Sequence, residues 1–86
     1  MVQFYDVQGL LVRRWVPGQR RLALEVWTGD GWARYADVDH VLRYGRRLTD
    51  VEALTLLIQI RGRNEALAHF SDDEARSALT SRLRRH

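Results

Sequence analysis

The sequence contains no cysteine and no lysine, a single proline and no long apolar run. Without cysteine the chain forms no disulfide, thiolate nucleophile or cysteine-ligated metal site. Without lysine a Walker-type phosphate loop is excluded, because its lysine contacts the phosphates. No apolar stretch approaches the roughly 18 residues of a membrane-spanning helix, and the first residues show no signal-peptide pattern. We therefore expect a cytoplasmic protein with no membrane partner and no cofactor.

All 14 basic side chains are arginines, and they stand against 11 acidic side chains to give a net charge of +3. A guanidinium is planar and binds phosphate or carboxylate through two donors. One interpretation of the arginine-only composition is therefore a surface that binds phosphate. The other is the codon composition of a GC-rich genome. The arginines form small clusters spread along the whole chain. Nucleic-acid-binding proteins usually concentrate them on one face, so this distribution favours a solvated, salt-bridged surface.

The 86 residues are consistent with a single small domain whose two halves differ in pattern. Residues 1–36 carry most of the turn signals and the alternating apolar segments, whereas residues 37–86 have helical spacing. The expected strands are 9–16, 21–27 and 32–36, with a further short strand at 4–7. The predicted fold is therefore α+β, with a three- or four-stranded antiparallel meander packed against three or four short helices.

The loop at residues 28–31 predicts the register of one hairpin. If all four residues form the loop, Trp27 lies opposite Trp32 and Glu25 lies opposite Arg34. One face of the hairpin then carries an aromatic pair and a salt-bridged pair. A shorter two-residue turn within the same loop is the main alternative. We favour the longer loop because it gives both faces a coherent set of side chains.

A short helix is expected immediately after the meander. Asp37 is a good N-cap, because its carboxylate can accept a hydrogen bond from the first helical turn. Val38, Val41 and Leu42 form an apolar stripe along this helix. Gly45 is a typical residue for its C-terminal end.

Two capping boxes mark the starts of the longer helices. The box at 49–52 opens a helix over 50–61, and the box at 71–74 opens a helix over 72–84. Residues 63–70 are expected to form another short helix between them. The last helix has acids in its first turn and arginines in its last, which the helix dipole favours.

Residues 54–60 alternate well enough to form a strand, but the capping box upstream favours a helix. Such a helix is apolar on nearly every side. It is either enclosed by the domain or shared with a second copy of the chain. Because so short a chain has little material to enclose it, we expect self-association, as a homodimer.

The leading functional hypothesis is a non-catalytic protein–protein interaction module, such as a bacterial or phage accessory or regulatory protein. Its candidate contact residues are Trp27, Trp32, Leu56 and Ile60. Exposed tryptophans are common anchors of interfaces. The alternative is that Trp27 and Trp32 close the hairpin as core residues. Trp15 is expected in the core with Leu22 and Leu24.

Nucleic-acid binding is the second hypothesis. Two arginine doublets flank the turn at Pro17-Gly18, which would place four guanidinium groups at one end of the meander. The candidate residues are Arg13, Arg14, Arg20, Arg21, Arg82, Arg84 and Arg85. The aromatic motif of the common RNA-recognition domain is absent from the sequence.

A metal-dependent enzyme centred on Asp37, Asp39 and His40 is the third and least favoured hypothesis. A transition-metal site would need a further ligand, and the other two histidines lie far away in sequence. Capping explains Asp37 without a metal. No nucleophile-elbow motif occurs, so we predict no enzymatic activity.

Overall fold

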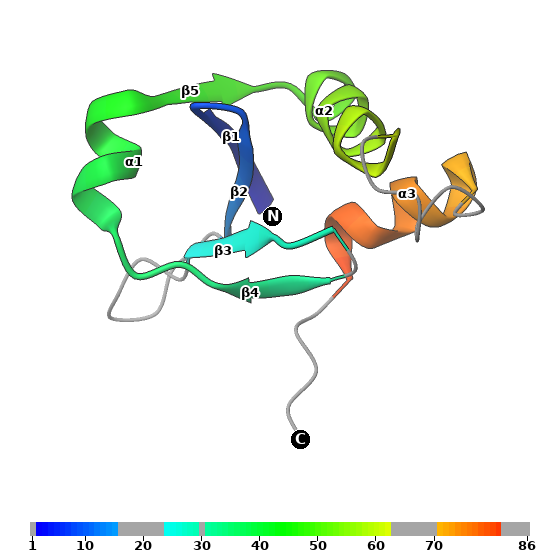
Figure 1. The fold of residues 1–86 in the computed structure, drawn as a ribbon, viewed down its shortest axis with the longest axis horizontal. Helices are drawn as coiled ribbons and strands as arrows, with labels where there is room; N and C mark the ends of the chain where they lie inside the picture. The colour runs from blue at the N-terminus through cyan, green and yellow to red at the C-terminus, as the bar shows by residue number, and fades with distance from the viewer. Residues whose placement is uncertain (1, 16–23, 30, 63–70, 82–86) are drawn as a thin grey trace.

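The computed structural model of the chain describes residues 2–15, 24–29, 31–62 and 71–81. These residues form a five-stranded antiparallel sheet with the strand order β4-β3-β2-β1-β5, accompanied by three helices (Figure 1). The strands are β1 (Val2–Val7), β2 (Leu10–Trp15), β3 (Leu24–Trp27), β4 (Trp32–Arg34) and β5 (Gly45–Leu48). The described helices are α1 (Val38–Tyr44), α2 (Asp50–Gly62) and α3 (Asp72–Thr80). The predicted α+β class is confirmed.

The meander begins with a tight hairpin that the sequence signals only in part. Val7 pairs with Leu10, so Gln8 and Gly9 alone form the turn between β1 and β2. Both turn residues have positive φ angles, 52° and 90°, as a two-residue type I′ turn requires. The Asp6 carboxylate accepts a hydrogen bond from the Gly9 N–H at 2.8 Å. β1 is consequently a full six-residue strand where a short one was expected.

The predicted register of the β3–β4 hairpin is confirmed. Trp27 pairs with Trp32 and Glu25 with Arg34, and the two indole rings meet edge to face with centres 5.3 Å apart. The predicted salt bridge between Glu25 and Arg34 is wrong, however. Glu25 also lies opposite Arg13 of β2, and its carboxylate binds that side chain instead.

β5 is the strand that the sequence did not predict. It lies in the half expected to be helical and pairs with β1, with Phe4 opposite Leu48. Its two central residues are Arg46 and Arg47, so it lacks the apolar alternation of a strand. Charged residues are common on edge strands, because they discourage pairing with other chains. Arg46 forms solvent-exposed ion pairs with Asp6 and Glu52, which link β5 to β1 and α2.

The helix starts are confirmed in detail. Asp37 caps α1 by accepting a hydrogen bond from the His40 N–H at 3.0 Å. In the first capping box, the Thr49 N–H donates to Glu52 at 3.0 Å and the Glu52 N–H donates back to the Thr49 hydroxyl at 3.2 Å. Ser71 caps α3 by accepting a hydrogen bond from the Glu74 N–H at 3.1 Å. Residues 54–60 are helical, as predicted, and the expected helix at 63–70 lies outside the described residues.

The two faces of the sheet have separate cores, because successive strand residues point to opposite faces. We call them the α2–α3 face and the α1 face after the helices that cover them (Figure 1). The larger core, on the α2–α3 face, contains Phe4, Leu11, Trp27, Trp32, Leu48, Ala53, Leu56, Leu57, Ala75, Ala78 and Leu79. The smaller core, on the α1 face, contains Val7, Val12, Leu24 and Val41. Both cores contain residues from strands and from helices, so the N-terminal and C-terminal halves of the chain pack together on both faces of the sheet.

One arginine lies inside the larger core, since the Arg13 side chain is 0% exposed. Its Nε donates to Glu25 at 2.8 Å and its Nη1 donates to the carbonyl oxygen of Leu79 at 2.9 Å. The guanidinium carbon also lies 4.0 Å from the ring centre of Trp32 and 4.9 Å from that of Trp15. Glu25 balances the buried charge, and the cation stabilises the negative end of the α3 dipole.

The same contacts explain where α3 ends. The Ala78 carbonyl accepts hydrogen bonds from the Trp32 indole at 2.7 Å and the Ser81 hydroxyl at 2.9 Å, and Arg13 binds the next carbonyl. Side chains thus satisfy carbonyl groups that a longer helix would use. α3 ends at Thr80, not near residue 84 as expected, and residues 82–86 lie outside the described part of the chain. The cation expected at this helix end comes from β2.

We expect Arg13→Ala to lower the free energy of unfolding by about 3–5 kcal/mol, because it leaves Glu25 buried without its cation. Arg34→Ala removes an exposed arginine from the edge strand and should change that free energy by less than about 0.5 kcal/mol. Urea unfolding followed by circular dichroism measures both. If Arg13→Ala fails to fold, Arg13→Lys is measured instead; it keeps the charge but should also lower the free energy of unfolding, because an ammonium lacks the planar, multiply donating guanidinium that contacts the two indoles. Wild-type stability of either Arg13 variant would contradict the prediction.

The first capping box predicts a pH dependence of stability. The Thr49 N–H, and after it the Arg46 guanidinium, lower the pKa of Glu52 below its ordinary value of 4.5. A carboxyl group whose pKa is lowered in the folded state stabilises the protein at pH values above its ordinary pKa. This stabilisation is lost as the pH falls through the lowered pKa. Glu52→Gln should therefore be less stable than the wild type at neutral pH and equally stable in acid. Urea unfolding at both pH values measures this. An equal difference at both would contradict it.

Candidate binding groove

The side chains predicted to contact a partner lie mainly in the protein's own core. Trp27 is 5% exposed, Trp32 is 7% exposed and Leu56 is 8% exposed, while Ile60 is partly buried against the same cluster. The structure thus corresponds to the alternative in which the tryptophans close the hairpin. α2 packs on the sheet and α3 through Ala53, Leu56 and Leu57, while Leu54, Ile58 and Ile60 are only partly buried. Self-association through this helix stays a prediction.

Trp15 does not pack with Leu24, because the two residues lie on opposite faces of the sheet. Trp15 shares the α2–α3 face with Arg13, and its indole N–H donates to Glu25 at 2.9 Å. Leu24 belongs to the smaller core on the α1 face. Leu22, its other expected neighbour, lies outside the described residues.

Of the arginines proposed to bind nucleic acid, the structure describes Arg13 and Arg14, and these two do not share a surface. Arg13 is buried, and Arg14 lies on the opposite face because the two are consecutive strand residues. The remaining candidates lie outside the described residues: Arg20, Arg21, Arg82, Arg84 and Arg85. The expected gathering of four guanidinium groups around one turn therefore loses Arg13. The other residues of this hypothesis stay a prediction.

Asp37, Asp39 and His40 do not gather into a metal site. The Asp37 carboxylate caps α1, while the His40 ring lies 3.1 Å from the Gln8 amide oxygen and 4.8 Å from the ring centre of Tyr44. Within the described residues, no group of three or more histidine, aspartate or glutamate side chains is placed to hold a metal ion. Local capping and stacking account for Asp37 and His40.

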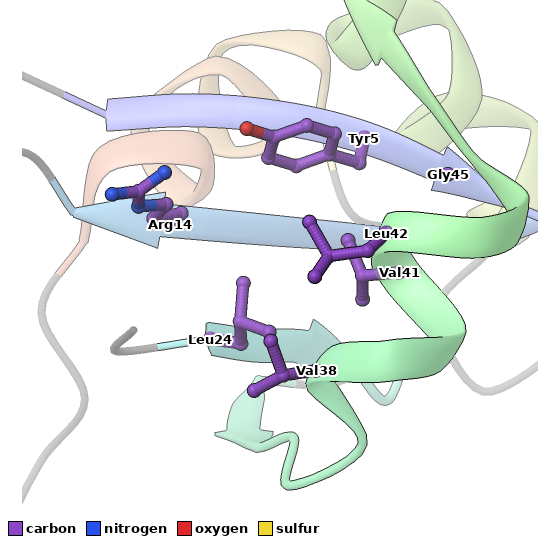
Figure 2. A pocket seen from close by; sticks show the side chains of 7 residues that line it. All are labelled: Tyr5, Arg14, Leu24, Val38, Val41, Leu42 and Gly45. Atoms are coloured by element: carbon purple, nitrogen blue, oxygen red, sulfur yellow. The ribbon is translucent and has the colours of Figure 1, made fainter. Parts of the chain in front are cut away.

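A groove lies between α1 and the sheet, and we call it the α1 groove. Its lining residues are Tyr5, Arg14, Leu24, Val38, Val41, Leu42 and Gly45. Figure 2 shows the aliphatic side chains of α1 directed towards the sheet, with Arg14 at the far end of the groove. The groove has a volume of about 140 Å³, close to the roughly 150 Å³ of an apolar cavity that accommodates benzene. It therefore has room for one apolar side chain.

Gly45 sets the position of α1 beside the groove. A Cβ atom at this residue would collide with the carbonyl oxygen of Val41, to which the Gly45 N–H donates at the end of the helix. Its φ of −75° is extended backbone, so the glycine provides space and not the left-handed conformation of a typical helix end. α1 consequently passes directly into β5 and stays close to the sheet.

Apolar side chains are exposed mainly on this side of the protein. Leu42 is 74% exposed, Tyr44 is 48% exposed and Leu10 is 45% exposed. All three belong to α1 or to the α1 face of β2. Val51, at the start of α2, is also 74% exposed but lies apart from them. The α1 side therefore carries three of the four large apolar side chains that are exposed among the described residues.

The sequence contained part of the signal for this groove. The apolar stripe of α1 was predicted, and three of its residues line the groove. Period-two alternation along β1 and β2 would have placed Tyr5 and Arg14 on one face. What was missing was the order of the strands, because only β5 pairing with β1 brings α1 back over that face.

No described helix has the length and apolar character needed to cross a membrane. The known proteins offer no guide to the function of the groove. Neither protein-family models, curated proteins nor solved structures give a match to this chain.

Proposed function

We propose that this chain is a small non-catalytic interaction module that binds a peptide segment of a partner protein in the α1 groove. The observation that carries the proposal is the apolar groove itself, with Leu42 exposed at its edge. Exposed apolar surface of this kind marks many protein-binding sites. The volume suits one inserted side chain, which is how peptide anchors are held. A cytoplasmic accessory or regulatory protein remains the expected biological setting.

The groove suits a partner protein better than a second copy of the chain. In a two-fold symmetric dimer, the same surface meets itself. A dimer centred on the groove would bring together the arginines of the α1 face, Arg14 and Arg47, from both copies. Like charges facing each other disfavour such a contact. Self-association through another surface stays a prediction, which the mass of the chain in solution tests.

Nucleic-acid binding is supported less well at this site. Proteins that hold single strands combine a track of cations with several stacking rings. Among the described residues, the lining of the groove contains one cation, Arg14, and one aromatic ring, that of Tyr5, beside aliphatic side chains. The described lining residues include no nucleophile paired with a base, which favours binding over catalysis.

Selection from a random peptide library against the full chain tests the proposed function. A selected peptide should bind about tenfold more weakly to Leu42→Ser, because the groove loses a leucine contact worth roughly 1.4 kcal/mol. Val51→Ser is the matched control, since both residues are 74% exposed and Val51 lies away from the groove. We expect it to bind as the wild type does. Fluorescence polarisation measures the dissociation constants, and thermal unfolding checks that both variants fold.

Two outcomes would contradict the proposal. In the first, Leu42→Ser binds the selected peptides as tightly as the wild type. In the second, no library peptide binds in the α1 groove, while a single-stranded oligothymidylate shifts the amide resonances of its lining residues. The second outcome would support the nucleic-acid alternative at this site.

A further inference from the structure

The two faces of the sheet differ in charge. The described strands contain two carboxylates, Asp6 and Glu25, and both lie on the α2–α3 face, where they pair with Arg46 and Arg13. The strand cations of the α1 face are Arg14 and Arg47, and no carboxylate of the described strands accompanies them. The α1 face of the sheet is therefore positive, with its charge uncompensated by the strands.

Arg14 is the cation that faces the groove. Its Nε is buried and has no hydrogen-bond partner among the described residues. Burying a charged donor without a partner is costly, and an acceptor that reaches the guanidinium group offsets that cost. Figure 2 shows the Arg14 guanidinium at the end of the groove opposite α1. An acceptor placed there would adjoin the apolar floor formed by Leu24 and Tyr5.

No other described charged group near the groove occupies the place beside the Arg14 guanidinium. The Arg47 guanidinium carbon lies 5.9 Å from the centre of the Tyr5 ring, so it adds positive charge beside the groove. Asp37 is engaged in the cap of α1, and the remaining titratable groups of the helix are Asp39, His40, Arg43 and Tyr44. None of these side chains lines the groove, whose described lining contains no carboxylate.

We propose that the α1 groove recognises an acidic peptide segment, in which an aspartate or glutamate binds Arg14 and a neighbouring apolar side chain enters the groove. This inference rests on the proposed function and names the chemistry of its partner. A carboxylate matches the planar fork of a guanidinium and can accept two hydrogen bonds from it. The apolar neighbour fills the space between Leu24 and Leu42.

Two small probes of the same shape test the inference. Hydrocinnamate joins a phenyl ring to a carboxylate by a short chain, and hydrocinnamamide replaces the carboxylate with a neutral amide. Each is titrated into the full-length chain while NMR follows the backbone amides of the groove. We expect both probes to shift Leu24 and Val41, with the carboxylate binding about tenfold more tightly.

Arginine variants assign this preference to one side chain. Arg14→Gln should abolish the tenfold preference for the carboxylate probe, so that the two probes bind about equally, because glutamine keeps polar atoms but loses the charge. Arg34→Gln is the matched control, as it makes the same change in net charge at an exposed residue of β4. It should keep the preference. Library peptides selected by the wild type should likewise carry an acidic residue beside an apolar one, whereas those selected by Arg14→Gln should not.

The outcomes separate the inference from the proposed function. If both probes bind the groove of the wild type equally, or library peptides bind there without an acidic residue, the acidic preference is overturned and the binding groove stands. If neither probe nor any library peptide shifts the groove residues, both proposals are overturned. If Arg34→Gln abolishes the preference as Arg14→Gln does, net charge is responsible and the assignment to Arg14 is overturned.

Discussion

The fold depends on how one buried guanidinium is satisfied. Removing a cation from water is costly, and the structure offsets that cost at Arg13 with a carboxylate, two indole rings and the last carbonyl groups of α3. These contacts join β2 to β3, to β4 through Trp32, and to a helix more than 60 residues away in sequence. The position and the end of α3 follow from them.

Local features of the fold were predictable because neighbouring residues encode them. The capping boxes and the Trp27–Trp32 register involve residues only a few positions apart, and they were predicted correctly. β5 and the burial of Arg13 were not predicted. Arg46 and Arg47 form a strand only because β1 provides an edge, and Arg13 is buried only because α3 covers it. Such pairings between distant segments leave little trace in composition or periodicity.

The candidate groove exists because the two faces of the sheet are covered unequally. The larger core uses α2, α3 and the tryptophans, which leaves the α1 face with a seven-residue helix to cover it. A chain of this size buries only part of the surface it exposes when unfolded, so one face stays less covered. The apolar stripe of α1 was predictable, but the groove beside it needed the strand order. Incomplete cover is thus the physical origin of the proposed binding site.

The arginine doublet in β2 shows how one residue type divides between structure and binding. Arg13 and Arg14 are consecutive, so the pleat directs them to opposite faces. On the α2–α3 face, Arg13 pairs with the Glu25 carboxylate. On the α1 face, the described strands place no carboxylate beside Arg14. The α2–α3 face therefore holds both carboxylates of the described strands, which leaves the α1 face of the sheet positive. A partner that completes this charge balance must bring its own acid, which is why the proposed ligand is acidic.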